Sequence, residues 1–195
     1  MRKDLISSLV AIVALTVMFG LAYPLVVTGV SQVVFPGRAD GSQVKKDGKV
    51  VGSRLIGQDF SKDQSLFQSR PSPTDYNPAG TAFSNLGPNS KDLKDAIVKN
   101  AAAYLKRERP YNRGLTKAGI PPDAVQTSAS GVDPQISVAN ARIQAHRVAA
   151  ERDMSLDDVL ALIDDHTDDR GLGFLGEPGV NVLELNLALD GDETS

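Results

Sequence analysis

The chain has 195 residues, of which 41% are hydrophobic, and this is enough for one ordinary domain core besides a membrane anchor of about thirty residues. The formal net charge of −3 and the pI near 5.4 do not have the basic character of nucleic-acid-binding proteins, so we expect no nucleic-acid partner. The absence of cysteine excludes disulfides, thiolate metal sites and a cysteine nucleophile.

The N-terminal segment is a candidate membrane anchor. No charged residue occurs between Leu5 and Gly37, and residues 5–30 are mainly Leu, Val, Ile and Ala. This stretch exceeds the roughly 20 residues that a helix needs to cross a bilayer, and also the apolar region of about 7 to 15 residues in a cleaved signal peptide. We therefore predict an uncleaved transmembrane helix in contact with membrane lipid, with an anchor at residues 1–36 and one soluble domain at residues 37–195.

The charges that flank the anchor bear on its orientation. Arg2 and Lys3 directly precede the apolar stretch, and cations beside a span favour the cytoplasmic side. Residues 38–49 carry four further cations, but these belong to a folded domain that can cross the membrane regardless of charge. We expect a cytoplasmic N-terminus and an extracytoplasmic domain. Pro24 predicts a kink in the span.

The first elements of the domain are a hairpin and a long irregular segment. Residues 44–51 predict a hairpin, because Asp47-Gly48 is a pair favoured where adjacent turn residues need positive φ. Residues 52–90 are dense in Gly, Ser, Pro and Asn without sustained periodicity, which indicates a long ordered loop or a linker. Such length without regular structure is uncommon in a compact domain and is usually functional or disordered.

Helices and a final strand are expected after this segment. Apolar residues recur at a spacing of four over residues 91–109, and Ile136, Ala139 and Ile143 mark the buried side of a second helix that reaches residue 152. A third, short helix follows Ser155 and runs through residue 163. Leucines alternate over residues 181–189, as in a half-buried strand. The pattern predicts an α+β domain in which a small sheet, containing the hairpin and the C-terminal strand, is covered on one face by about three helices.

Enzymatic signatures are mostly missing. The phosphate-binding Gly-x-x-x-x-Gly-Lys-Ser/Thr loop and the Asp-Lys-Thr-Gly sequence of P-type ATPases are absent, so the chain is not itself a transport ATPase. A serine hydrolase could use Ser128 or Ser130 with Asp133 and His146, but no Gly-x-Ser-x-Gly elbow is present. Each of these residues also has an ordinary reading as a turn former or a helix-surface side chain.

The acidic run at residues 164–169 leaves a second alternative open. Its carboxylates and the imidazole of His166 could bind a hard cation, although the spacing does not match an EF-hand. A solvated acidic turn is the simpler interpretation. The alternatives to an interaction role are thus a membrane-anchored extracytoplasmic hydrolase and a cation-binding module.

Five strings occur in order behind the single span. They are GSRLIGQDF at 52–60, SRPS at 69–72 with YN at 76–77, SNLGPN at 84–89, SASGVDPQIS at 128–137, and VNVLELNLALD at 180–190. Together they closely resemble the KdpC family, the C subunits of the Kdp potassium-transporting ATPase, over essentially the whole chain. The chain departs from the family pattern at Gln135, where His is frequent, at Ala129, where Gly is common, and at Ala82-Phe83, where glycines are more usual.

The resemblance implies an accessory, non-catalytic subunit of a bacterial inner-membrane complex that imports potassium at the expense of ATP. It implies three protein partners: a channel-like potassium-translocating subunit, a P-type ATPase subunit and a small single-span subunit. It implies no catalytic residue, no metal site and no cofactor of the chain's own.

The resemblance also implies a catalytic chaperone that promotes ATP binding by the P-type subunit, with ATP shared between the two chains. The nucleotide neighbourhood would be Ser128, Ser130, Gly131 and Gln135. Because an extracytoplasmic domain cannot reach cytoplasmic ATP, this role conflicts with our orientation, and we give more weight to stabilisation of the complex. The loop at residues 52–89 is expected to contact the exterior of the potassium-translocating subunit through Arg70, Pro71, Tyr76, Asn77, Asn85 and Gly87.

Overall fold

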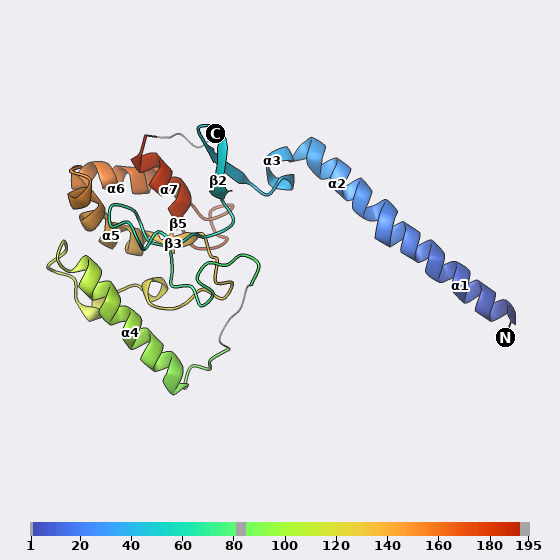
Figure 1. Ribbon diagram of the computed structural model, residues 1–195, viewed down its shortest axis with the longest axis horizontal. Coiled ribbons are helices and arrows are strands. Elements are labelled where there is room, and N and C mark those ends of the chain that lie inside the picture. The colour runs from blue at the N-terminus through green and yellow to red at the C-terminus, as the bar shows by residue number, and fades with distance from the viewer. Residues whose placement is uncertain (1, 81–84, 192–195) are drawn as a thin grey trace. The chain divides into compact units, whose positions relative to one another are not determined.

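The computed structural model describes residues 2–80 and 85–191, and the chain divides into two compact units, Met1–Gln43 and Val44–Ser195. Each unit has its own character. The first is helical and the second combines helices with two small sheets (Figure 1). The α+β class predicted from the sequence is confirmed.

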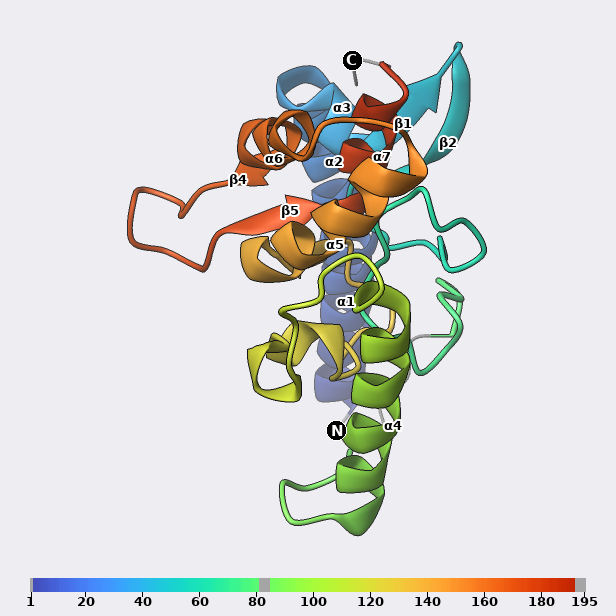
Figure 2. The ribbon, with the colours of Figure 1, turned by 90° about the vertical axis from the view of Figure 1, so that its left-hand side faces the viewer.

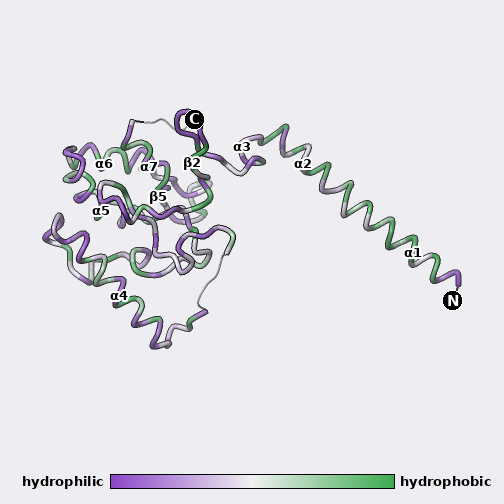
Figure 3. Tube along the Cα trace, viewed as in Figure 1, coloured by the Kyte–Doolittle hydropathy of each residue, from purple (hydrophilic) through white to green (hydrophobic). Residues whose placement is uncertain are grey.

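The first unit is dominated by one long apolar helix. It comprises α1 (Arg2–Val17), a π-helical turn (Met18–Ala22) and α2 (Tyr23–Val34), and the short α3 (Pro36–Ala39) follows. The helix from Arg2 to Val34 has 33 residues and is long and apolar enough to cross a membrane. Hydrophobic residues predominate along its length (Figure 3). The predicted single N-terminal helix is confirmed, and it has the length and apolar composition of a membrane span.

The π-helical turn accommodates Pro24, where we predicted a kink. Proline has no N–H to donate, and its ring crowds the carbonyl four residues earlier in an α-helix. The turn immediately before it is widened, with the N–H of Tyr23 donating to the carbonyl of Met18, five residues back. Such π turns are a recognised way for a helix to absorb a local conflict.

The hairpin lies where the sequence predicts it. Strands β1 (Gln43–Lys46) and β2 (Lys49–Ser53) form a two-stranded sheet. Asp47 and Gly48 both have positive φ, at 51° and 74°, as the Asp-Gly pair requires.

The second sheet is separate from the hairpin, and this corrects the single sheet predicted from the sequence. It consists of β3 (Gln135–Ser137), β5 (Gly179–Asn181) and β4 (Thr167–Asp168), in that order and antiparallel throughout. Val180 of β5 lies opposite Ile136 of β3 and Thr167 of β4.

The three predicted helices are confirmed as α4 (Lys91–Glu108), α5 (Val138–Glu151) and α6 (Leu156–Asp165). Each begins after a serine whose hydroxyl accepts a hydrogen bond from a backbone N–H of the first turn. The predicted buried side of α5 is partly wrong, because Ala139 is exposed. Its buried face instead includes the polar Asn140 and Gln144, which hydrophobic periodicity does not detect. Two short 3₁₀ turns, Lys117–Gly119 and Pro122–Ala124, lie between α4 and β3.

The predicted strand at residues 181–189 is wrong. Only Gly179–Asn181 is a strand, and α7 (Val182–Leu189) follows, with the Asn181 side chain accepting from the N–H of Glu184, 3.2 Å away. Alternating leucines indicate a strand when one face is exposed, but here Glu184 and Asn186, which lie between them, are buried as well. A segment buried on all sides has no face for the alternation to mark.

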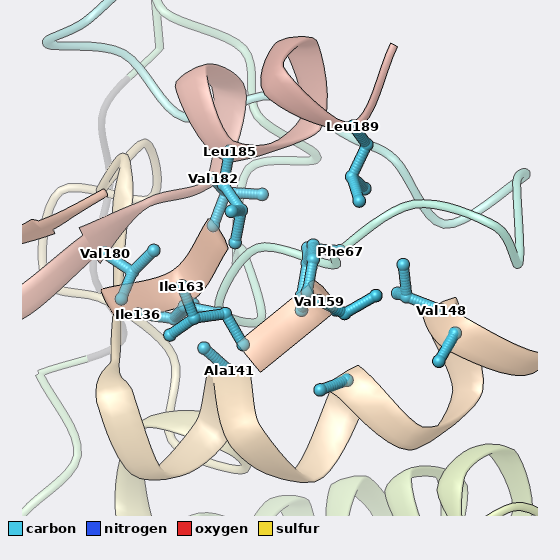
Figure 4. Close-up of a cluster of buried hydrophobic side chains, with 12 residues drawn as sticks. Phe67, Ile136, Ala141, Val148, Val159, Ile163, Val180, Val182, Leu185 and Leu189 are labelled. Carbon is cyan, nitrogen blue, oxygen red and sulfur yellow. The ribbon is translucent and has the colours of Figure 1, made fainter. Parts of the chain in front are cut away.

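The main core lies between α5, α6, α7 and β5 (Figure 4). It also contains Phe67, which comes from the irregular segment before α4 and is completely buried. The irregular segment therefore belongs to the packed body of the domain. The core residues are Phe67, Ile136, Ala141, Ala145, Val148, Ala149, Val159, Ile163, Val180, Val182, Leu185 and Leu189.

Candidate functional site

The long segment between β2 and α4 is an ordered loop, although its described residues contain neither helix nor strand. Side chains of the helices supply the hydrogen bonds that a neighbouring strand would otherwise give. The N–H and carbonyl of Phe67 both bond to the amide of Asn186, at 2.8 and 3.0 Å. The N–H and carbonyl of Gln68 bond to the amide of Gln144, at 2.8 and 3.2 Å. The backbone of Phe67 and Gln68 is thereby satisfied without a sheet.

A buried ion pair fixes the same loop to α4 and α5. Arg147 and Glu108 are both fully buried, and the Arg147 Nε lies 3.1 Å from a Glu108 carboxylate oxygen. The Arg147 Nη1 donates to the carbonyls of Gln64 and Leu66 in the loop. Burial lowers the pKa of Arg147, and the Glu108 carboxylate opposes that shift. The pair leaves no signal in the sequence, because charged residues within a helix are normally surface positions.

Two predicted sets of site residues meet in one place. The N–H of Ser128 donates to the carbonyl of Pro71 (3.2 Å), and the Ser72 hydroxyl donates to the carbonyl of Gly131 (2.6 Å). An ion pair between Arg70 and Asp133 (2.7 Å) closes the contact between residues 70–76 and 128–135, which we call the loop seam.

The residues predicted to bind nucleotide make hydrogen bonds within the domain. Ser128 is buried, and its hydroxyl accepts from the N–H of Gly131 at 2.9 Å. Ser130 is exposed, but its hydroxyl accepts from the N–H of Val132 at 3.2 Å. The Gln135 amide donates to the Asp168 carboxylate on β4, at 2.9 Å. Hydroxyls that bond their own turn are typical of structural serine turns.

Two glycines permit the close approach of chain segments at the loop seam. Gly131 has a φ of +77°, and a Cβ there would lie 2.5 Å from the Thr74 hydroxyl oxygen. Gly57 donates its N–H to the carbonyl of Val132 at 2.7 Å, and a Cβ there would lie 2.4 Å from the carbonyl oxygen of Asp133. A larger residue at Gly57 requires the backbone of Asp133 to move, and one at Gly131 adopts a strained φ and displaces the Thr74 side chain.

Tyr76 fixes the conformation of residues 70–76, on the side of the loop seam opposite the serine turn at residues 128–131. Its φ is +58°, an unusual value for a non-glycine residue, and its N–H donates to the Ser72 hydroxyl at 2.9 Å. Its own hydroxyl donates to the carbonyl of Arg70 at 2.6 Å. Burial raises the pKa of the Tyr76 hydroxyl to about 12, and the charge of Asp59 adds to the rise. Tyr76 is therefore a neutral hydrogen-bond donor at physiological pH.

The remaining predicted interface residues are exposed. Asn77 accepts from the N–H of Ala79 through its side chain, at 3.0 Å. Asn85 and Gly87 lie on the approach to α4, and within the described residues no hydrogen bond joins them to the loop seam. Ser84 and the Ala82-Phe83 pair lie outside the described residues.

A small pocket of about 200 Å³ lies between the loop and α4. Polar side chains in its lining are already bonded within the domain: the Gln68 amide donates to the carbonyl of Phe60 (2.7 Å), the Asn100 amide to the carbonyl of Val125 (2.8 Å), and Arg107 pairs with Glu108 (2.6 Å). We assign no ligand to this pocket.

The hydrolase and cation alternatives gain no support from the geometry. Both oxygens of the Asp133 carboxylate are engaged, one by Arg70 and one by the N–H of Gln135, and among the described residues no hydrogen bond joins Asp133 or Ser128 to His146. Among all the residues that the structure describes, no three carboxylate or imidazole side chains lie close enough together to hold a metal ion.

Comparison with known proteins identifies the family. The family described as "KdpC: K+-transporting ATPase, c chain" matches residues 5–191. A potassium-transporting ATPase KdpC subunit of Mycobacterium tuberculosis (strain H37Rv) is 47% identical over 192 residues, which cover 97% of this chain and 99% of the relative. The KdpC subunit of Methylibium petroleiphilum is 49% identical over 194 residues and 98% of each chain. The chain, with its apolar span and its ordered loop packed against helices, therefore belongs to the KdpC family of c chains of K⁺-transporting ATPases.

Proposed function

We propose that this protein is the accessory subunit of an ATP-driven potassium import complex in the bacterial inner membrane. It stabilises the assembly and promotes ATP binding by the P-type subunit without hydrolysing ATP itself. The observation that carries this proposal is the family match across residues 5–191, which includes both the membrane helix and the domain. The absence from the sequence of a phosphate-binding loop and of the Asp-Lys-Thr-Gly sequence supports a non-catalytic role.

In this proposal the N-terminus lies in the cytoplasm and the domain lies on the extracytoplasmic side of the membrane. The support is the position of Arg2 and Lys3 at the start of the span. Within the span, Gly20 and Gly29 have no side chain to prevent the close approach of helices from the channel-like subunit or the small single-span subunit.

The exposed residues beside the loop seam, at and around Asn77, are the proposed contact with the exterior of the potassium-translocating subunit. Arg70, Pro71 and Tyr76 are half-buried and bonded internally, so they fix the shape of the loop, and Asn77 and its exposed neighbours make the contact. A surface that is already rigid loses less conformational entropy on binding than a flexible one. This favours a docking role for the ordered loop.

The effect on ATP binding is transmitted through partner subunits in this proposal. Support comes from donors of the turn that are already used inside the domain: the N–H groups of Gly131 and Val132 donate to the Ser128 and Ser130 hydroxyls, and the Gln135 amide donates to Asp168. Direct sharing of ATP would require those bonds to open.

Co-purification tests the proposed function. The chain carries a C-terminal tag and is purified in mild detergent from its native membrane, and the accompanying proteins are identified by mass. We expect a P-type ATPase subunit, a polytopic potassium-translocating subunit and a small single-span subunit in fixed ratio. Recovery of the chain alone would overturn the proposal.

Accessibility in intact cells tests the orientation. The chain contains no cysteine, so Ser130→Cys introduces a single thiol at an exposed position. We expect a membrane-impermeant thiol reagent to label it without permeabilisation. A cysteine added before Met1 is the control and should react only after permeabilisation; the reverse pattern would place the domain in the cytoplasm.

A further inference from the structure

An exposed apolar tip lies on the loop between β4 and β5. Residues 171–176 form this tip, in which Leu172, Phe174 and Leu175 have exposed fractions of 84%, 70% and 54%. The loop projects from the body of the domain (Figure 2). Single exposed apolar residues are ordinary, but three within four consecutive residues form a patch that water solvates poorly, and such patches mark interaction sites.

The tip has a defined conformation. Gly171 and Leu175 exchange two backbone hydrogen bonds, at 2.8 and 2.9 Å, and the N–H of Gly173 donates to the carbonyl of Arg170 at 2.9 Å. An ion pair of 2.6 Å between Arg170 and Glu177 closes the base. Leu172 is held at a φ of +54°, a conformation that is unfavourable for leucine. The apolar side chains are thus presented on a fixed turn, as a preorganised binding element requires.

Acidic residues surround the base of the tip. Asp168, Asp169 and Glu177 flank the tip in the chain, and Asp164 and Asp165 lie just before β4; all five carboxylates are exposed, and within the described residues two ion pairs offset them, one from Arg142 and one from Arg170. Membrane surfaces with anionic lipids attract cations and repel such a cluster. A second copy of this chain would present the same negative charge. The acidic surround therefore disfavours both a lipid surface and self-association through the tip.

We propose that the apolar tip docks on another protein, in an apolar socket rimmed by Lys or Arg. This inference rests on the proposed function, because it takes that protein to be a partner subunit of the same membrane assembly. Phe174 and Leu172 fill the socket, and the surrounding carboxylates face the basic rim. Aromatic anchors in such sockets dominate binding, while rim charges select the partner and set its orientation.

A substitution in the full-length chain tests the energetic role of the tip. Phe174→Asp places a carboxylate in the socket, and we expect the fraction of chain retained in the purified assembly to fall tenfold or more. Val98→Asp is the matched control, because Val98 is also an exposed apolar residue, at 49%, and lies on α4. Retention of the Phe174→Asp chain equal to that of the control would overturn the proposal.

Photo-crosslinking identifies what covers the tip. A benzophenone amino acid replaces Phe174 in the tagged chain, and the purified assembly is irradiated. We expect a crosslink to one subunit, at a segment with apolar residues flanked by Lys or Arg. A crosslink to lipid, to a second copy or to nothing would overturn the inference. If the assembly purifies intact in these cases, the proposed function stands without it; if no assembly purifies, the proposed function itself has failed.

Discussion

Arg147 and Glu108 are completely buried charges that pair with each other. A buried charge costs several kcal/mol unless it is paired and hydrogen-bonded. Here the guanidinium is surrounded by the Glu108 carboxylate, the Gln144 side chain and two loop carbonyls. The pair therefore depends on both partners, and the loop depends on the pair.

Removal of the carboxylate leaves the guanidinium buried without a countercharge. We expect Glu108→Leu to lower the free energy of unfolding by about 3–5 kcal/mol, measured by denaturant unfolding of the full chain in detergent. The control is Asp95→Leu, which removes a carboxylate from an exposed pair with Lys91 and should cost less than about 1 kcal/mol. Equal losses would contradict the role given to Arg147.

Gly131 allows a separate test of the loop seam. Gly131→Ala brings a Cβ within 2.5 Å of the Thr74 hydroxyl oxygen at a φ of +77°, whereas Gly48, at +74°, has nothing within 4 Å of the same position. Gly131→Ala and the control Gly48→Ala carry the same backbone cost, because the two φ values are nearly equal. We expect Gly131→Ala to be the more destabilising by about 1–3 kcal/mol, from the clash alone. Thermal unfolding of the two full-length variants measures the difference, and no difference would show that Thr74 moves away freely.

At the scale of elements, the sequence predicts those whose signals are local. The Asp47-Gly48 pair and the spacing of Ile97, Ala101 and Leu105 suffice for the hairpin and α4, because turn geometry and one buried face are properties of neighbouring residues. The strand predicted for the C-terminal segment is wrong, because the surroundings of this segment bury Asn186 as well as its leucines. The order of the long loop is also beyond local pattern, since side chains far along the chain satisfy its backbone.

The attachment of this loop can be tested at Asn186. Asn186→Leu leaves both the N–H and the carbonyl of Phe67 buried without a partner. We expect a loss of about 2–4 kcal/mol of stability and faster amide hydrogen exchange at residues 64–68. Asn89→Leu, at an exposed position, is the control and should leave exchange in that segment unchanged. Unchanged exchange in the Asn186 variant would mean that the loop is held by its other contacts.

At the scale of the molecule, the family strings name the residues of the candidate site but not what those residues do. They lead to Arg70, Ser128 and Gln135, yet the partners of these side chains, Asp133 and Asp168 among them, come from the fold. Asp133 was within reach of the sequence, because a half-buried arginine needs a carboxylate and one follows the serine turn directly. Asp168 was not, because only β-sheet formation brings β3 near β4.

Carboxylates determine how the domain responds to acid. Lys46, followed by Arg152, lowers the pKa of Asp190 from 3.8, and hydrogen bonds from Ser65 lower that of Asp63. Groups with lowered pKa values contribute stability above about pH 3.8, and that stability is lost as the pH falls through the lowered values. We expect the melting temperature to fall below that pH. Asp190→Asn should lower it at pH 7 but not at pH 2, and a constant difference between the two would contradict the assignment.

The π-helical turn at Met18–Ala22 changes which residues share a side of the 33-residue membrane helix. Each residue of an α-helix advances about 100° around the axis, and the Tyr23 to Met18 bond encloses one residue more than an α-helical turn. Residues 23–34 are therefore displaced by about 100° from the positions that a regular wheel assigns. If mutational scanning of residues 2–17 finds that the positions sensitive to substitution lie on one side of the helix, the sensitive positions among residues 23–34 should lie about a quarter of the circumference away from those that a regular wheel predicts.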